Sequence, residues 1–144
     1  IHLAEREGGE ILCGGKRPSL ESPFDKGAFL KPTVVSNIDH QSRTATEEIF
    51  GPVVTLHQFK TEEEAVEMAN STDYGLAGSV WTSDLVRGKK LAEKIETGMV
   101  WVNTWLHRDL RVPFGGVKDS GVGTEGGRWS LSFFSQPVNI CVKE

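Results

Sequence analysis

The residues best suited to chemistry in this chain are Glu48 and Phe50, within the hexapeptide Glu47-Glu48-Ile49-Phe50-Gly51-Pro52. A carboxylate can accept two hydrogen bonds at once, as the vicinal hydroxyls of a ribose require, and a phenylalanine ring can pack against a flat heterocycle. The Gly-Pro pair that follows sets the direction of the chain. Residue types alone leave a second interpretation open, a surface acid followed by a core phenylalanine at a turn.

A second stretch of interest covers residues 104–123, where polar, aromatic and glycine residues are dense. Glycine-rich loops either turn sharply or let the backbone approach a ligand. Residues 121–126 formally match the G-x-G-x-x-G pattern of dinucleotide-binding loops. We reject that interpretation, because no buried strand precedes the match and no second βα unit follows it. A turn or the entrance to a helix is the expected structure there.

The composition is that of a globular protein with many turns. The net charge of -4 over 144 residues, without a run of Lys or Arg, makes a nucleic-acid or membrane partner unexpected. No apolar run reaches the length of a membrane span. Cys13 and Cys141 have no metal-ligand spacing and predict no disulfide framework, so we expect small core residues in a reducing cytoplasm and no metal site.

The elements that must position these residues alternate between short strands and helices. Pro32 cannot donate a hydrogen bond to a sheet, so the strand that contains it is expected to be an edge strand or an irregular one. Thr61 and Glu64 have the spacing of a capping box at the start of a helix. Strands are expected at 10–13, 29–35, 52–59, 75–81 and 99–103, and helices at 1–7, 62–71 and 84–96.

The order strand, helix, strand, helix, strand predicts an α/β fold with a largely parallel sheet and flanking helices. Ligands of such sheets bind outside the carboxyl ends of the strands, so the loop after Asn103 is the expected place for chemistry. The strand at 75–81 is made of small residues, which lets another backbone come close.

Four motifs in order and at the right spacing resemble the aldehyde dehydrogenase superfamily. They are residues 47–52, 74–77, 98–103 and 113–123, and the resemblance covers essentially the whole chain. The resemblance implies that residues 1–136 are the C-terminal part of a catalytic domain. It also implies that residues 137–144 form a strand for oligomerisation, so we expect a homo-oligomer.

The resemblance assigns roles to single residues. Glu48 matches the glutamate that binds the nicotinamide-side ribose, and Phe50 matches the ring that packs near the nicotinamide. NAD is therefore the expected cofactor, with NADP left open. Phe114 resembles the aromatic residue of the substrate funnel. Asn103 matches a position that we expect to be structural, because an Asn at a strand end usually satisfies nearby backbone groups.

Arg108 lies where many members of the family have an apolar or aromatic wall. A guanidinium binds a carboxylate through two charge-assisted hydrogen bonds, each worth about 1.5–3 kcal/mol, so the expected substrate is an aldehyde with a distal carboxylate. The segment resembles the branch that acts on 2-hydroxymuconate or 2-aminomuconate semialdehyde, with Trp105 beside Arg108 as a substrate-binding residue. The alternative pairs Arg108 with Asp109 or another acid as a brace of the loop. We expect the neighbouring His107 and Arg111 to be loop or structural residues.

The family's reaction uses a cysteine thiolate that attacks the aldehyde, hydride transfer to the nicotinamide, and a glutamate that activates water. The resemblance places these residues and the nucleotide domain upstream of Ile1, so we assign no catalytic residue here. Cys13 lacks the sequence context of the nucleophile. We expect a C-terminal fragment of an NAD-dependent semialdehyde dehydrogenase, inactive alone, whose partners are the N-terminal part of the enzyme and a small aldehyde.

Two other classes of function stay open. A non-catalytic assembly or interaction module would keep the same fold and use a terminal strand, in which Val138, Ile140 and Val142 alternate, to extend a partner's sheet. A stand-alone nucleotide binder would use the glycine run at 121–126. A longer native chain favours the enzyme, a native start at Ile1 favours the module, and the lack of any response to NAD excludes the binder.

Overall fold

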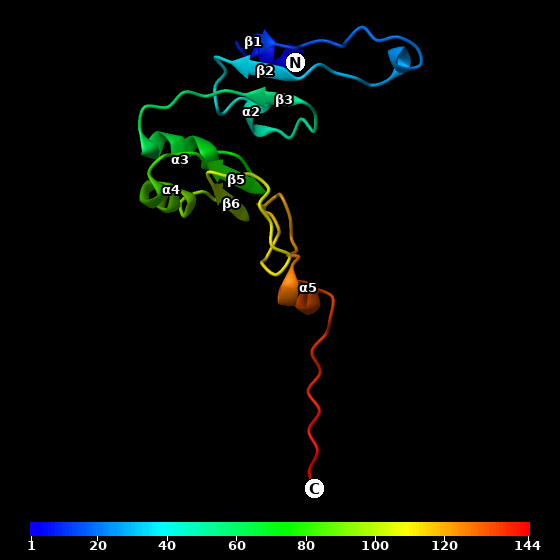
Figure 1. Ribbon diagram of the computed structural model, residues 1–144, viewed down its shortest axis with the longest axis vertical. Coiled ribbons are helices and arrows are strands. Elements are labelled where there is room, and N and C mark those ends of the chain that lie inside the picture. The colour runs from blue at the N-terminus through cyan, green and yellow to red at the C-terminus, as the bar shows by residue number, and fades with distance from the viewer. The chain divides into compact units, whose positions relative to one another are not determined.

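The computed structural model describes residues 1–144, which divide into two units, residues 1–72 and residues 73–144. Both units contain short strands and helices, so the α/β class expected from the sequence is present (Figure 1). The first unit contains α1 (His2–Arg6), β1 (Glu10–Cys13), the 3-10 helix η1 (Phe24–Lys26), β2 (Thr33–Ser36), α2 (Arg43–Thr46), β3 (Val53–Thr55) and α3 (Glu62–Asn70). The second contains β4 (Tyr74–Gly75), β5 (Ala77–Val80), α4 (Leu85–Ala92), β6 (Met99–Val102), β7 (Val117–Lys118) and α5 (Gly127–Phe133).

The sheet of the first unit has the order β1-β2-β3, with β1 antiparallel and β3 parallel to β2. Of the two alternatives for the strand that contains Pro32, the edge position was wrong, because β2 is the central strand. Pairing begins only at Thr33, whose backbone N–H donates to the carbonyl of Pro52 at 2.8 Å. The missing donor of Pro32 therefore lies outside the ladder and removes no strand hydrogen bond.

A small core packs beneath this sheet. Ala4, Val35 and Ile38 are its buried apolar side chains, with Ile11 and Val53 packed against them. Thr33 is also fully buried, and its hydroxyl is satisfied because it donates to the carbonyl of Lys31 and accepts from the N–H of Gly15.

The capping box before α3 forms with a shift of one residue. The Thr61 hydroxyl accepts a hydrogen bond from the Glu64 N–H at 3.2 Å, as the pattern predicts. The Glu64 carboxylate reaches back to the N–H of Lys60, one residue before the cap, at 2.6 Å. The helix begins where the sequence predicts that it begins.

In the second unit, β5, α4 and β6 form a crossover between parallel strands, with Ala77 opposite Met99 and Val80 opposite Val102. The single strand expected at 75–81 is divided, because β4 pairs with β7 and β5 pairs with β6. Helix α4 is shorter than the expected 84–96, because the chain after Ala92 tightens into turns with hydrogen bonds three residues apart. Residues 121–126 lead into α5 at Gly126, the helix entrance that the sequence predicts.

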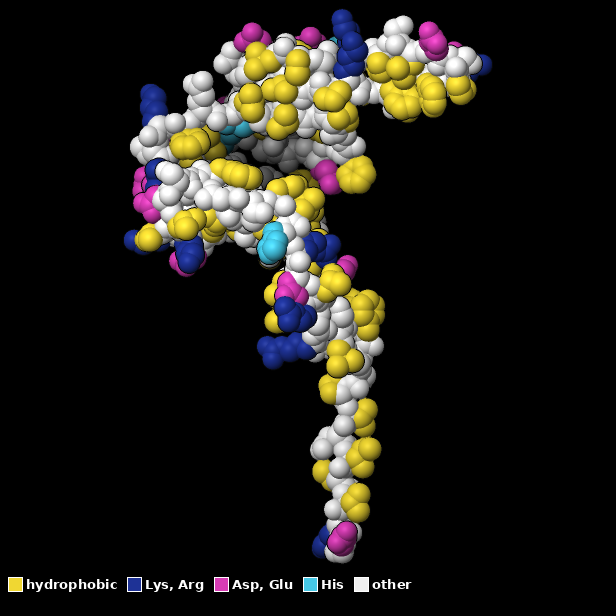
Figure 2. Space-filling view, viewed as in Figure 1, with side chains coloured by type: hydrophobic (Ala, Val, Ile, Leu, Met, Phe, Trp, Pro, Cys, Tyr) yellow, Lys and Arg dark blue, Asp and Glu magenta, His cyan; other side chains and the backbone are white.

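The last residues, 134–144, pair with no strand of this chain. Hydrophobic side chains line this segment (Figure 2), and Val138, Ile140 and Val142 are exposed. The oligomerisation strand therefore stays a prediction. No helix of the protein combines the length and apolar character that a membrane span needs.

The expectation that both cysteines are core residues was wrong. Cys13 and Cys141 are free thiols with exposed side chains. Cys13 ends β1, which is an edge strand of the first sheet, and Cys141 belongs to the unpaired C-terminal segment. A position at a strand edge or beyond the last helix leaves a small apolar side chain uncovered.

Candidate functional site

Glu48 and Phe50 lie in the loop that joins α2 to β3. Both are exposed, and the ring of Phe50 is 93% accessible. The backbone of Phe50 has a φ of 51°, in the left-handed region that bulky residues rarely adopt. Such a conformation costs on the order of 1–3 kcal/mol and persists where the surroundings impose it, often at ligand-binding sites. The expectation of a core phenylalanine at this turn is thus excluded.

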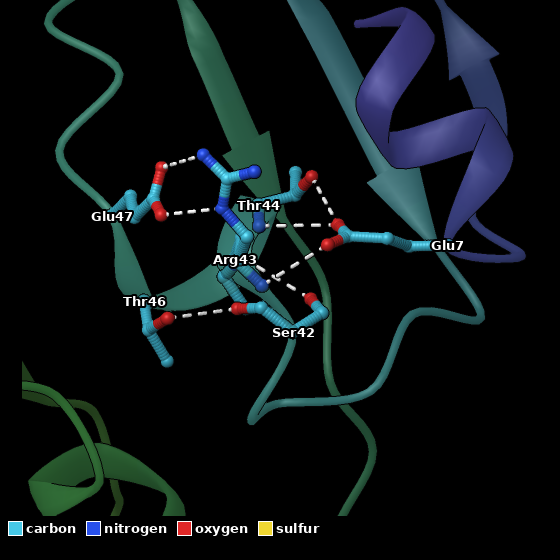
Figure 3. A network of polar contacts seen from close by, with 7 residues as sticks. Glu7, Ser42, Arg43, Thr44, Thr46 and Glu47 are labelled. Carbon is cyan, nitrogen blue, oxygen red and sulfur yellow. Dashed lines mark hydrogen bonds and ion pairs between the residues drawn. The ribbon is translucent and has the colours of Figure 1, made fainter.

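The helix before this loop is held by a carboxylate from a distant part of the chain (Figure 3). Glu7 accepts hydrogen bonds from the N–H groups of Arg43 and Thr44, each at 3.2 Å, and from the Thr44 hydroxyl at 2.6 Å. Ser42 caps the same helix by accepting from the N–H of Ala45. The start of α2 is therefore anchored both locally and through Glu7, just before the loop that carries Glu48.

The two adjacent acids of the hexapeptide have different environments. Glu47 pairs with the Arg43 guanidinium, whose Nε and Nη2 donate to its two carboxylate oxygens at 2.6 and 3.1 Å (Figure 3). Glu48 has no ion-pair or hydrogen-bond partner in the chain. The structure thus separates a structural carboxylate, Glu47, from one that is available to a ligand, Glu48.

Both engaged carboxyls have lowered pKa values. The Thr44 hydroxyl, which donates to Glu7, is the main cause that lowers the pKa of Glu7, with its backbone hydrogen bonds adding to the effect. The hydrogen bond from Arg43 lowers the pKa of Glu47. Both groups are therefore ionised at neutral pH, which the anchor requires.

In the second unit, Asn103 directly follows β6, has a φ of 55° and connects two loops. Its Oδ1 accepts from the N–H of Thr82 at 2.8 Å, and its Nδ2 donates to the carbonyl of the same residue at 2.7 Å. The expectation that Asn103 is a structural residue is confirmed. It fixes the point at which the loop that carries the candidate substrate-binding residues leaves the sheet.

A hollow of about 240 Å³ lies between β6 and the loop that follows it. The Arg108 guanidinium lies over the ring of Phe114, with 3.8 Å from Cζ to the ring centroid, a cation–π contact. Phe114 is itself fixed by two backbone hydrogen bonds with Glu125, at 2.7 and 2.8 Å. The lining residues are Gly98, Met99, Val100, Trp101, His107, Arg108, Asp109, Val112, Pro113 and Phe114.

Gly98 closes one side of this hollow. A Cβ at this position would collide with the backbone carbonyl oxygen of Gly115, so the two backbones approach each other at a distance that only glycine permits. The close approach joins the start of β6 to the turn after Phe114. Two of the sequence motifs are thus in contact.

Trp105 packs beside the hollow and does not line it. Its ring lies 5.0 Å from the ring of Trp101, which does line the hollow, with the two planes tilted by 60°. The indole N–H of Trp101 donates to the carbonyl of His107 at 2.9 Å. The structure therefore places Trp105 as a support of the wall that Trp101 forms.

The acid beside Arg108 does not pair with it. Asp109 is bound by Arg111, whose Nε donates to the two carboxylate oxygens at 2.9 and 3.1 Å. The Arg111 guanidinium lowers the pKa of Asp109, and the carboxylate raises the pKa of Arg111. The expected alternative, a brace between Arg108 and Asp109, is thus wrong. Arg108 has no carboxylate partner in the chain.

The predicted site residues form two groups, one in each unit. The structure brings Arg108 and Phe114 into contact, and places Glu48 and Phe50 in one loop. Sequence reasoning missed Glu7, which lies 37 residues from Thr44 and gives no local signal. The spacing of Asp109 and Arg111, two residues apart with opposite charge, could have indicated their pairing.

A hollow of about 780 Å³ in the first unit contains none of the predicted site residues. It is lined by Leu12, residues 36–40, residues 56–58 and Met68. Nor does any cluster of His, Cys, Asp and Glu side chains in the chain have an arrangement that could hold a metal ion.

Comparison with known sequences agrees with the motifs. Residues 1–140 match the profile of the aldehyde dehydrogenase family. The chain is 45% identical over 143 residues to a 2-aminomuconic 6-semialdehyde dehydrogenase from a Pseudomonas species, covering 99% of this chain and 29% of that protein. It is 46% identical over 137 residues to a 2-hydroxymuconic semialdehyde dehydrogenase from Pseudomonas putida, covering 95% of this chain and 28% of that protein. The chain thus spans less than a third of these relatives.

Comparison with solved structures gives the same family. A betaine aldehyde dehydrogenase from Staphylococcus aureus, solved in complex with NAD+, has a TM-score of 0.86 and 42% identity over 92% of this chain and 26% of that one. An aldehyde dehydrogenase from Mycobacterium tuberculosis, also solved with NAD+, has a TM-score of 0.86 and 41% identity over 98% of this chain and 30% of that one. The motifs, the fold and the family match together show that this chain belongs to the aldehyde dehydrogenase family.

Proposed function

We propose that these 144 residues are the C-terminal part of an NAD-dependent aldehyde dehydrogenase that oxidises a semialdehyde with a distal carboxylate to the acid. The muconic semialdehydes are the substrate class we favour. The observation that carries the proposal is the guanidinium of Arg108, which lines a hollow, lies on Phe114 and has no carboxylate partner. Relatives named for 2-aminomuconic and 2-hydroxymuconic semialdehydes support it.

Arg108 would bind the distal carboxylate of the substrate. Because the ring of Phe114 covers one face of the guanidinium, the N–H donors in the guanidinium plane stay available for two parallel hydrogen bonds. The apolar lining from Met99 and Val100 would accommodate the carbon chain. Trp105 would act indirectly, by supporting the ring of Trp101.

The residues of the hexapeptide suit NAD. The free carboxylate of Glu48 would accept hydrogen bonds from ribose hydroxyls, and the accessible ring of Phe50 would pack against the nicotinamide. When bound, the cofactor supplies the acceptor for the hydride that leaves the substrate. These two residues suit the ribose and the ring that NADP shares with NAD, so NADP stays an alternative.

We further propose that the terminal segment serves assembly into a homo-oligomer in the cytoplasm. Val138, Ile140 and Val142 are exposed and unpaired in the chain, which favours a β-strand addition to a partner. An assembly module without catalysis is the second candidate function, and the same observation supports it. Activity of the full-length enzyme separates the two.

The test is substrate discrimination by the full-length enzyme that we propose contains this segment. The ratio of kcat/KM for 2-hydroxymuconate semialdehyde to kcat/KM for hexanal compares a six-carbon aldehyde that has a carboxylate with one that has none. Arg108→Gln is expected to lower this ratio at least about tenfold, because it removes two charge-assisted hydrogen bonds. A ratio unchanged by Arg108→Gln, or formation of NADH by the 144-residue chain alone, contradicts the proposal.

A further inference from the structure

The hollow beside Phe114 contains a negative charge as well as a positive one. Asp109 lines it together with Arg108, its neighbour in the sequence. Left unpaired, this carboxylate would compete with an anionic substrate for the Arg108 guanidinium, and would repel the substrate through space. A site that selects carboxylates therefore needs Asp109 to be neutralised.

Arg111 occupies both oxygens of Asp109. Oδ1 accepts from the backbone N–H of Arg111 at 2.9 Å and from its Nε at 2.9 Å, while Oδ2 accepts from Nε at 3.1 Å and from Nη2. Three of these contacts come from the two guanidinium donors Nε and Nη2, which are held in one rigid plane, so the carboxylate is fixed in direction as well as neutralised. Arg111 itself is absent from the lining of the hollow.

The exposure of the pair bears on its purpose. The side chain of Arg111 is 88% accessible and that of Asp109 is 41% accessible. Ion pairs with such exposure contribute little to the stability of a fold, because water screens them. Stabilisation of the fold is therefore a weak explanation for this ion pair. Orienting and neutralising the Asp109 carboxylate at the rim of the hollow is a better one, because that role does not require a large stabilisation.

We propose that Arg111 is a positioning residue that determines substrate specificity, because it holds Asp109 and so leaves the Arg108 guanidinium free for a substrate carboxylate. This inference rests on the proposed function of Arg108. It assigns a joint role to Asp109 and Arg111, because the Asp109 carboxylate leaves substrate binding undisturbed only while Arg111 binds it. We therefore predict that the effect of substituting Arg111 depends on whether Asp109 is present.

The experiment uses the same two aldehydes, 2-hydroxymuconate semialdehyde and hexanal, and the same full-length enzyme. Arg111→Gln is expected to lower the charged-to-neutral ratio of kcat/KM by about tenfold, mainly through KM for the charged aldehyde. The double variant Asp109→Asn/Arg111→Gln is expected to return the ratio to within about threefold of wild type, because the released carboxylate is gone. A residue that only braced the loop would not give this recovery.

Arg128→Gln is the matched control, since it removes the same charge from α5, where Arg128 lies 4.9 Å from the Trp129 ring and not in the hollow. Its ratio should stay within about twofold of wild type. If Arg111→Gln fails to fold, Arg111→Lys is compared with the double variant Asp109→Asn/Arg111→Lys. The double variant must then have a higher charged-to-neutral ratio of kcat/KM than Arg111→Lys alone. These comparisons use thermal midpoints to confirm that each variant is folded.

The outcomes separate the two proposals. If Arg108→Gln leaves the ratio unchanged, the proposed carboxylate anchor fails, and this inference fails with it. If Arg108→Gln lowers the ratio but Arg111→Gln leaves it within about twofold of wild type, only the role of Arg111 is wrong. A double variant that is no better than Arg111→Gln alone also overturns the role of Arg111.

Discussion

At the scale of single residues, the site depends on which charges are already engaged. Glu47 and Glu48 are adjacent and chemically identical, yet Arg43 binds only Glu47. Arg108 and Arg111 are three residues apart, yet Asp109 binds only Arg111. In both places a structural ion pair leaves one neighbouring charged group without a partner of opposite charge. The free groups, Glu48 and Arg108, are the ones that we assign to ligands.

A comparison of the two glutamates tests this division. In the full-length enzyme, Glu48→Gln is expected to raise KM for NAD by about tenfold, because a neutral amide accepts weaker hydrogen bonds from ribose hydroxyls than a carboxylate does. Glu47→Gln is the matched control, with the same change of charge one residue away. It should raise KM for NAD by less than about threefold. Equal effects of the two substitutions on KM, measured by initial rates, would contradict the assignment.

The sequence predicted the residue types of the site better than their partners. Glu48, Phe114 and Arg108 were chosen from motifs, and the structure brings Arg108 onto the Phe114 ring, while their roles in binding stay predictions. The separation of Glu47 from Glu48 depends on the side-chain conformation of Arg43, which no pattern of residue types shows. The support from Glu7 depends on a contact between residues far apart in the chain.

At the scale of elements, the anchor of α2 is of most interest, because a helix of four residues is not stable by itself. It is held by Ser42 at its start and by the carboxylate of Glu7. The loop with Glu48 and Phe50 begins directly after it. The positions of Glu48 and Phe50, the candidate cofactor-binding residues, thus depend on a contact between α2 and the end of α1.

Removal of the Thr44 hydroxyl should show, through the pH dependence of stability, how far α2 depends on its contact with Glu7. The pKa of Glu7 is lowered in the folded state from an ordinary value of 4.5, so the folded protein binds fewer protons there than the unfolded protein. The stabilisation is therefore fully present above about pH 4.5 and is lost as the pH falls through the lower folded pKa. Thr44→Val should lower the thermal midpoint of the full-length enzyme by about 1–2 °C near neutral pH, and the difference from wild type should shrink in acid.

Thr46→Val is the control for that substitution. Its hydroxyl donates to the carbonyl of Ser42, the N-cap of the same helix, at 2.9 Å, and forms no hydrogen bond to a titratable group. The difference between Thr46→Val and wild type should stay constant as the pH falls. If the thermal midpoints of both variants follow the same pH profile, Glu7 is not the group responsible.

Element prediction succeeded where the signal is local and failed where it depends on pairing. The capping residues of α3 and the crossover from β5 through α4 to β6 follow from short patterns. The central place of β2 and the division of the strand around Leu76 depend on which strands lie beside them. Pro32 was misleading because a proline just before a strand and one inside it look alike in the sequence.

At the scale of the whole molecule, the chain buries little. Ala4, Val35 and Ile38 are its buried hydrophobic core, while many large apolar side chains are exposed, among them Trp81, Leu110 and Phe134. A folded domain of this length normally buries well over half of the surface that its unfolded chain exposes. The small core agrees with the fact that the chain spans about 29% of its relatives.

The isolated chain should therefore differ measurably from the full-length enzyme. We expect the 144-residue chain to bind the dye ANS several-fold more strongly per mole than the full-length enzyme, and to unfold over a broad range of urea concentration. The measurements are ANS fluorescence and circular dichroism during urea titration. A sharp unfolding transition without dye binding would show that the chain forms a complete domain.

Under the proposed function, the contact between Gly98 and Gly115 limits which substrates the full-length enzyme could acquire. The obstacle to a side chain at Gly98 is a backbone oxygen, which cannot rotate away as a side chain can. In a mutational scan of the hollow, substitutions of Arg108 and Val112 should give folded enzyme with an altered substrate preference. Substitutions of Gly98 should not give folded enzyme. If the hollow binds the substrate as we propose, evolution toward bulkier or smaller aldehydes must act on its loop side, because the obstacle at Gly98 closes the other side to variation.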